Sequence, residues 1–97
     1  MLYLAFFKMK PGVSVGSSQV IEKSRKWWDG GAKPAGLKTL GVYGCLGTEA
    51  RDVLVFEASS HNDIRELVNY WRDISDFEVH PAVDLAANFK DQGMKVS

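Results

Sequence analysis

His80 is the residue of this sequence best suited to proton transfer. It lies between Glu78 and Ala82, in a segment where apolar and polar residues alternate. An imidazole there can act as a general base, or bind haem iron if it faces an apolar cavity wide enough for the macrocycle. A histidine at the surface or at an interface is the simpler interpretation. We therefore keep His80 as a candidate catalytic residue and predict no haem or other cofactor.

Glu57 is the second candidate for acid–base chemistry, because it interrupts the apolar run from Val53 to Ala58. A carboxylate that faced the interior there would have a raised pKa, which suits a general acid or base near neutral pH. The simpler alternative is a glutamate at the end of a strand that reaches solvent or pairs with Arg51 or Lys38. We favour this alternative, and Glu57 is a catalytic candidate only on the first interpretation.

Four further side chains are candidates for a ligand pocket. Trp71 and Asn69 stand near the end of a predicted helix, where an aromatic ring and a polar group could together orient a flat ligand. Tyr3 and Tyr43 could add hydroxyl groups to such a pocket. Each also has a structural explanation, because Trp71 completes an apolar helix stripe and tyrosines are common in packing at sheet interfaces.

Several other chemistries have no support in the sequence. One cysteine, Cys45, and two distant histidines, His61 and His80, do not make a zinc site, so we predict no metal. The glycines between residues 41 and 47 do not match a dinucleotide fingerprint or a phosphate loop. Cys45 also lacks an activating context for covalent catalysis.

Six predicted elements position these residues. Apolar runs bounded by turn residues predict strands, and apolar residues at helical spacing predict two helices. Serines can cap both helices, and Ser60 with Asp63 has the spacing of a capping box. In chain order the elements are a strand at 2–8, a helix at 17–29, strands at 38–47 and 53–58, a helix at 60–71 and a strand at 77–84.

Local features refine these elements. Gly41 and Gly44 suggest a bulge in the second strand or a close approach by another backbone or a ligand, and Pro81 places the fourth strand at an edge or a bulge. A polar turn is predicted at 48–52. The first helix is expected to have one apolar face, formed by Val20, Ile21, Trp27 and Trp28.

This order of elements predicts an α+β domain with the ferredoxin-like βαββαβ arrangement, a four-stranded antiparallel sheet and two helices on one face. In the strands at 2–8 and 53–58, both the odd-numbered and the even-numbered residues are mainly apolar, so both faces of these strands are apolar. The helices can cover only one of these faces, and an exposed apolar face usually marks an interface. We therefore predict a homodimer packed sheet to sheet. The alternative is that the C-terminal tail, 87–97, folds back over part of the second face.

The segment from Trp71 to Pro81, together with Pro34 to Lys38, resembles an uncharacterised domain-of-unknown-function family in the dimeric α+β barrel superfamily. The likeness runs from Leu2 to about Ala86 and implies the ferredoxin-like fold and a dimer that forms an α+β barrel. Relatives in the superfamily include cofactor-independent monooxygenases of aromatic polyketides, haem-degrading monooxygenases, small isomerases and effector-binding modules. Their ligands commonly lie between sheet and helices. The loop at 30–36 and the glycine-spaced second strand depart from the family pattern.

Length and charge limit the remaining classes. Ninety-seven residues suit one domain, 1–97, with a core at about 2–86 and a tail at 87–97. Twelve basic and twelve acidic residues give no net charge, which argues against nucleic-acid binding.

The N-terminal apolar run stops at Lys8, too early for a signal peptide or a membrane span, so no membrane partner is expected. A single cysteine fits a reducing compartment, and we expect the cytoplasm.

Basic and acidic residues are unevenly distributed along the chain. Residues 8–38 hold seven basic and two acidic side chains, whereas residues 49–91 hold ten acidic and four basic ones. The two predicted helices fall in these oppositely charged halves. Charge attraction between them within one chain is therefore expected.

These observations predict a small homodimer that binds a small, partly apolar organic molecule between sheet and helices. Cofactor-independent monooxygenase or isomerase-type chemistry is one hypothesis for the fate of the bound molecule. The alternative is a non-catalytic ligand-sensing or protein-interaction module. The sequence does not distinguish these two functions and does not identify the ligand.

Overall fold

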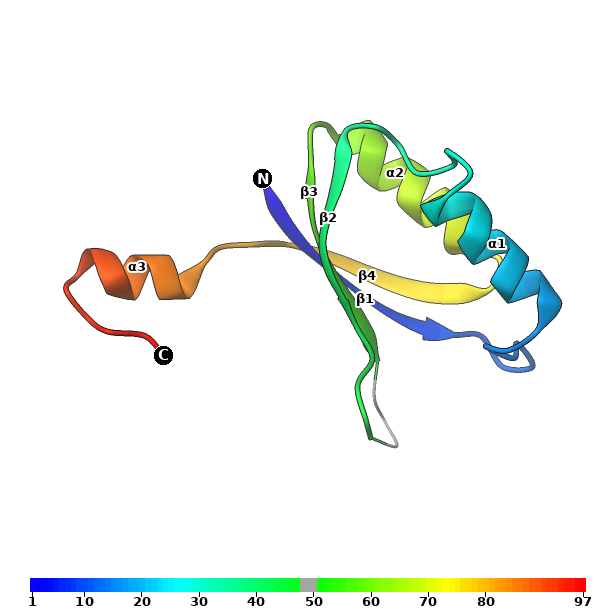
Figure 1. Ribbon diagram of the computed structural model, residues 1–97, viewed down its shortest axis with the longest axis horizontal. Helices are drawn as coiled ribbons and strands as arrows, with labels where there is room; N and C mark the ends of the chain where they lie inside the picture. Colours follow the sequence, from blue (N-terminus) through cyan, green and yellow to red (C-terminus); the bar gives the residue numbers. More distant parts are fainter. Residues whose placement is uncertain (48–50) are drawn as a thin grey trace.

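The computed structural model describes residues 1–47 and 51–97, which form a four-stranded antiparallel sheet and three helices (Figure 1). The strands are β1 (Leu2–Met9), β2 (Leu37–Tyr43), β3 (Asp52–Ala58) and β4 (Ser75–Ala82). The helices are α1 (Ser18–Trp28), α2 (His61–Trp71) and α3 (Leu85–Asp91). The predicted α+β class and antiparallel sheet are confirmed, and each of the six predicted segments forms the expected type of element.

The strands lie in the order β2-β3-β1-β4, so the two most apolar strands, β1 and β3, occupy the centre of the sheet. β4 pairs only with β1 and is an edge strand, as Pro81 predicts. Helices α1 and α2 lie side by side along one face of the sheet (Figure 1). We call this face the covered face and the opposite one the open face.

The core lies between the covered face and the two helices. Every second residue of the central strands points into the core. Among these residues, Tyr3 stacks on Phe56 with ring centroids 5.6 Å apart. Trp27 of α1 and Leu67 of α2 meet them from the other side and are fully buried. Lys23 of α1 lies 3.2 Å from the carboxylate of Asp73, two residues beyond the end of α2. This contact agrees with the predicted attraction between the oppositely charged halves of the chain.

The remaining residues of the central strands form the open face. Leu4 of β1 lies opposite Val55 of β3, and Phe6 lies opposite Val53. All four side chains are apolar and only half-buried. The prediction that both faces of the central strands are apolar is therefore confirmed.

The start of α2 is fixed by hydrogen bonds that the sequence predicts in part. The Asp63 carboxylate accepts hydrogen bonds from the backbone N–H groups of Ser59 and Ser60, each at 3.2 Å. Ser59 in turn donates its backbone N–H to the Gly36 carbonyl at 3.0 Å. A Cβ atom at Gly36 would collide with the Asp63 carboxylate, so only glycine allows the loop before β2 to come this close to α2.

β2 is shorter than predicted, because it ends at Tyr43 and not at Gly47. The bulge expected in this strand is present between Thr39 and Gly41. The Tyr43 ring lies over Gly41, where a Cβ atom would be 2.6 Å from it. The close approach is therefore made by a side chain of the same strand, whereas the prediction assigned it to another backbone or a ligand. The predicted turn at 48–52 falls largely on residues 48–50, which lie outside the described residues.

The predicted apolar face of α1 is partly wrong. Val20 and Trp27 are buried, but Ile21 and Trp28 are 46% and 45% exposed. The reason is geometric: Val20 and Trp27 are seven residues apart and share one side, and each next residue is rotated by about 100°. α1 therefore packs through a narrow stripe.

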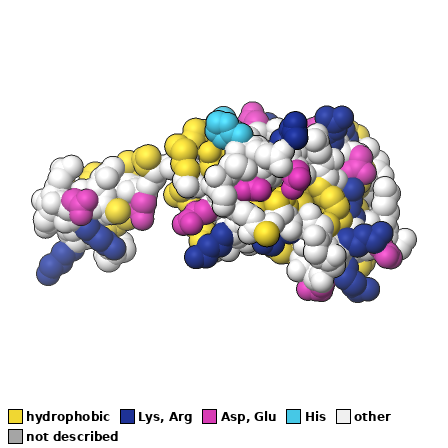
Figure 2. Space-filling model, turned by 90° about the horizontal axis from the view of Figure 1, so that it is seen from above, with side chains coloured by type: hydrophobic (Ala, Val, Ile, Leu, Met, Phe, Trp, Pro, Cys, Tyr) yellow, Lys and Arg dark blue, Asp and Glu magenta, His cyan; other side chains and the backbone are white. Residues whose placement is uncertain are grey.

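The C-terminal segment contains more regular structure than the tail predicted at 87–97. It contains α3, whose N-cap residue Asp84 accepts a hydrogen bond from the Ala87 N–H at 3.1 Å. α3 stands clear of the sheet and of the other helices, and the space-filling view shows it as an arm beside the body of the domain (Figures 1 and 2). Within one chain it therefore does not fold back over the open face, and that alternative is wrong.

Candidate ligand-binding cavity

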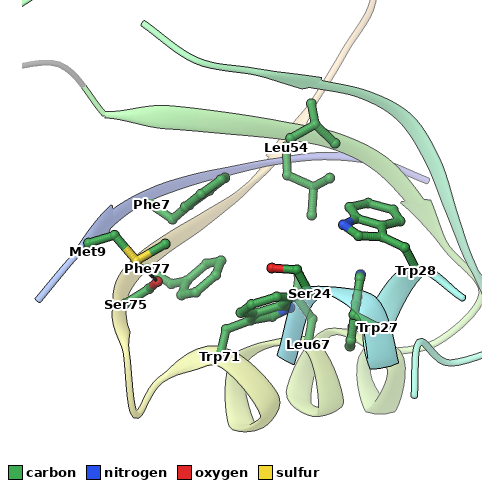
Figure 3. Close-up of a pocket in the computed structure, with 11 residues that line it drawn as sticks. Phe7, Met9, Ser24, Trp27, Trp28, Leu54, Leu67, Trp71, Ser75 and Phe77 are labelled. Atoms are coloured by element: carbon green, nitrogen blue, oxygen red, sulfur yellow. Dashed lines mark hydrogen bonds between the residues drawn. The ribbon is translucent and has the colours of Figure 1, made fainter. Parts of the chain in front are cut away.

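A cavity of about 190 Å³ lies between the covered face and the helices (Figure 3). Its walls are almost entirely apolar, and five of the eleven lining residues are aromatic. Residues from the sheet and its ends are Phe7, Met9, Val42, Leu54, Ser75 and Phe77, and residues from α1 and α2 are Ser24, Trp27, Trp28, Leu67 and Trp71. All three tryptophans of the protein contribute to the lining.

Stacked rings hold the aromatic walls in place. Phe7 and Phe77 stack on neighbouring strands with ring centroids 5.4 Å apart, and Trp27 meets Trp71 edge-on at 5.7 Å. Tyr70 packs behind both tryptophans, at 5.0 Å from Trp27 and 5.1 Å from Trp71. Its hydroxyl donates a hydrogen bond of 2.7 Å to the Lys23 carbonyl of α1. The shape of the cavity is therefore set before any ligand enters.

The lining of the cavity differs in how far its residues are exposed to solvent. Trp28 and Val42, one from each element, are 45% and 48% exposed, whereas Trp27 and Leu67 deeper in the lining are buried. The least covered lining residues therefore come from α1 and β2, and the best covered ones from the core.

Two serine hydroxyls are the polar side-chain oxygens of the lining. The Ser75 hydroxyl donates a hydrogen bond to the Met9 sulfur at 3.6 Å. The Ser24 oxygen points into the space between the sheet residues and α1 (Figure 3). None of the described residues that line the cavity has an ionisable side chain. The cavity can bind by shape, aromatic contact and a hydrogen bond, but it supplies no general acid or base.

Of the four pocket residues predicted from the sequence, the cavity includes only Trp71. Asn69 and Tyr43 are exposed and lie outside the lining. Tyr3 is buried against Phe56 and borders a different hollow, which its ring shares with Ile64 of α2 and with β4.

The structure places His80 on the open face, away from the cavity. Its cross-strand neighbour is Leu4, and its ring lies edge-on to Phe6 with centroids 6.2 Å apart. The His80 Nε2 atom is 3.7 Å from the Glu78 carboxylate, which also pairs with Arg51 at 2.7 Å. His80 is exposed, as the simpler interpretation expects.

Glu57 also lies on the open face, opposite Leu2 of β1 and Lys38 of β2. It is exposed, so the hypothesis of an interior carboxylate is wrong, and the solvent-facing alternative holds. Because the sheet separates Glu57 and His80 from Trp71, the structure does not bring the candidate acid–base residues to the cavity.

One motif is missing from the candidates above, which include no Gly-x-Ser-x-Gly nucleophile elbow, although spacing alone reveals it. Gly12 to Gly16 match the Gly-x-Ser-x-Gly pattern of hydrolase nucleophiles. Ser14 is exposed in the loop between β1 and α1, and the Ser14 carbonyl accepts the Ser17 N–H at 3.1 Å in the turn that leads into α1. Among the described residues, no hydrogen bond joins Ser14 to a histidine, so the base that such a nucleophile needs is missing.

The cavity residues other than Trp71 are not identified as a site by sequence reasoning. The sequence pattern predicts that Phe7 lies in an apolar strand and that Trp27 and Trp28 lie on the apolar face of a helix. This prediction is correct for Phe7 and Trp27. The available indication is that tryptophans end both helices, at Trp28 and at Trp71. Bringing them together needs the relative placement of the helices, which spacing along one chain does not give.

Neither a metal-binding group nor a membrane-spanning helix is found in the described chain. In the part of the chain that the structure describes, no three His, Cys, Asp or Glu side chains gather as a metal-binding group. None of the described helices has the length and apolar character needed to cross a bilayer.

A small α+β domain with an aromatic cavity between its sheet and helices is thus defined by fold and geometry. Residues 1–90 match a family described as a domain of unknown function (DUF3303), and the chain belongs to this family. The match covers the sheet, α1, α2 and residues 85–90 of α3. No curated protein and no solved structure matches the chain.

Proposed function

We propose that this protein binds a small aromatic molecule in the cavity between its sheet and helices. The observation that supports this function is the cavity itself, with about 190 Å³ of space and aromatic walls. An apolar cavity of about 150 Å³ accepts benzene, whereas drug-sized ligands occupy roughly 300–1,000 Å³. The size therefore suits one ring with a small substituent, or two small fused rings.

Binding without acid–base catalysis is the form of this function that we favour. The lining has no ionisable side chain, and His80 and Glu57 lie on the other side of the sheet. These positions favour a ligand-sensing module over isomerase-type chemistry, which needs a base within hydrogen-bond reach of the substrate. A cofactor-independent oxygenation would have to proceed without a protein base in the cavity.

We also propose a ferredoxin-like fold that dimerises through the open face into an α+β barrel. The strand order β2-β3-β1-β4, with α1 and α2 on one face, supports the ferredoxin-like assignment. The half-buried apolar residues of the central strands support an interface, because contiguous apolar patches on a monomer usually mark one. The cavity lies on the covered face and would stay accessible in this dimer.

The arm that carries α3 gives independent support for a second copy. Isolated helices shorter than about 12–15 residues are marginal in water, and α3 has 7. Its apolar side chains Leu85 and Phe89 are 59% and 42% exposed. A second copy would supply the apolar contact that the arm does not find in its own chain.

The experiment that tests the binding function compares two substitutions on α1. Ser24→Phe places a ring in the cavity, whereas Arg25→Phe adds the same ring at the next position, which is exposed. Isothermal titration calorimetry with one-ring and fused two-ring aromatic compounds should give saturable binding to the wild type and to Arg25→Phe, and none to Ser24→Phe. Binding that survives Ser24→Phe, or no binding to any form, would refute the proposal.

A further inference from the structure

We propose that Ser24 hydrogen-bonds the ligand, so that the cavity selects aromatic rings that carry a hydroxyl group. This inference rests on the proposed binding function and narrows its ligand class. Ser24 lies on α1 between the helix and the sheet, and its oxygen is directed into the cavity (Figure 3).

The two serines of the lining differ in what their hydroxyls contact. Ser75 is 2% exposed, and its hydroxyl is engaged with the Met9 sulfur at 3.6 Å. Ser24 is half-buried, and within the described residues its hydroxyl forms no hydrogen bond with another protein group. The backbone carbonyl of Val20, one helical turn earlier, is the usual partner of a helical serine, but no such bond is formed here.

The surroundings of Ser24 favour ligands that can hydrogen-bond its free hydroxyl over ligands that cannot. A serine hydroxyl can both donate and accept, and closing an apolar ligand over it would remove its water partners without replacing them. Trp27, Trp28 and Trp71 surround the same space and offer ring contact to any flat ligand. A ring with a hydroxyl substituent satisfies Ser24 and fills the aromatic space, whereas the matching ring with a methyl group leaves Ser24 unpaired. Sites built to hydrogen-bond a ligand hydroxyl discriminate against analogues that lack it.

Phenol and toluene are the probes that test this inference, since they have similar size and differ in the hydroxyl group. Ser24→Ala removes the proposed hydrogen bond, and Ser75→Ala is the matched control, with the same change in the same cavity. Because all three tryptophans line the cavity, quenching of tryptophan fluorescence reports its occupancy, and calorimetry gives the affinities.

We expect Ser24→Ala to weaken phenol binding by about fivefold, the size of a typical net hydrogen bond, and to leave toluene binding unchanged or slightly stronger. Ser75→Ala should leave the ratio of phenol to toluene affinity as in the wild type. If both probes bind and Ser24→Ala leaves their ratio unchanged, the role of Ser24 is refuted and the binding function stands. If neither probe binds the wild type, both proposals fail.

Discussion

The two faces of the sheet are built from the same four strands, yet they differ in how their apolar residues are covered. On the covered face, Ala5 and Phe56 are fully buried under α1 and α2. On the open face, their strand neighbours Leu4 and Val55 are only half-buried. Both sets are hydrophobic, so composition alone does not explain the difference.

The helices of one chain are sufficient to cover one face only. The covered face is not filled completely, and the gap left under α1 and α2 is the aromatic cavity. The open face has charged residues at its margins, including Glu78, Arg51 and Lys38. An apolar centre with a polar rim is the usual anatomy of a protein interface. The contrast between the two faces supports the two partners that we propose, a small molecule for the covered face and a second copy for the open face.

The largest effect is expected from a change in the core of the covered face. Trp27→Ala should lower the free energy of unfolding by about 3–5 kcal/mol, because it removes a fully buried indole that packs against Tyr70 and Trp71. Chemical denaturation measures this loss. Trp28→Ala, at the exposed neighbouring position, should cost much less. Equal losses would show that α1 does not pack through a narrow stripe.

A charged side chain introduced on the open face should weaken the proposed dimer. Val55→Lys places an ammonium group at the centre of the proposed interface and should weaken the dimer by about 2 kcal/mol or more, roughly thirtyfold. Sedimentation equilibrium measures the change in association. Glu66→Lys, at an exposed position on α2, is the control and should leave association unchanged. An intact dimer in Val55→Lys would exclude the open face as the interface.

Two helix caps allow the body of the domain to be compared with its arm. Asp63→Ala should destabilise the fold by about 1–2 kcal/mol, since its carboxylate accepts hydrogen bonds from Ser59 and Ser60. Asp84→Ala removes the cap of α3 and should leave the melting temperature of the domain nearly unchanged, because the arm stands apart. Thermal unfolding followed by circular dichroism measures both. A comparable loss from Asp84→Ala would mean that α3 is part of the cooperative core.

The smallest effect is expected from the ion pair between Lys23 of α1 and Asp73, which follows α2. Asp73→Asn should cost no more than about 1 kcal/mol, because Asp73 is largely exposed to solvent and surface pairs are weak. The loss should shrink as salt is added. Urea denaturation at low and high ionic strength measures it. A larger loss that does not depend on salt would show that packing, and not charge, joins α1 to α2 at this position.

Most of the fold can be predicted from the sequence because its periodicities are strong. The apolar runs of β1 and β3 and the capping residue Asp63 each specify a local structure. α3 is not predicted because 7 residues with large apolar side chains only at Leu85 and Phe89 give a weak helical pattern. The end of β2 is misplaced because the glycines on either side of Tyr43 remove the side chains that would define a period.

The candidate site is much harder to predict. Trp71 is identified because it ends a clear helix stripe, but Ser24 has no feature in the sequence that separates it from any helical serine. Its importance comes from the space beneath it, which depends on how Phe7 and Phe77 stack and how Trp27 is held by Tyr70. His80 and Glu57 stand out in the sequence because their side chains can transfer protons. Their positions in the alternation of β4 and β3 place them on the open face, whereas the cavity lies on the covered face.

A native mass spectrum of the purified full chain reports assembly and bound small molecules together, so it examines the two faces of the sheet in one experiment. We expect a species of twice the 10.8 kDa chain mass that takes up one small aromatic molecule per chain when phenol is added. A monomer at micromolar concentration that takes up no aromatic molecule would contradict both the assignment of the open face to a second copy and that of the covered face to a ligand.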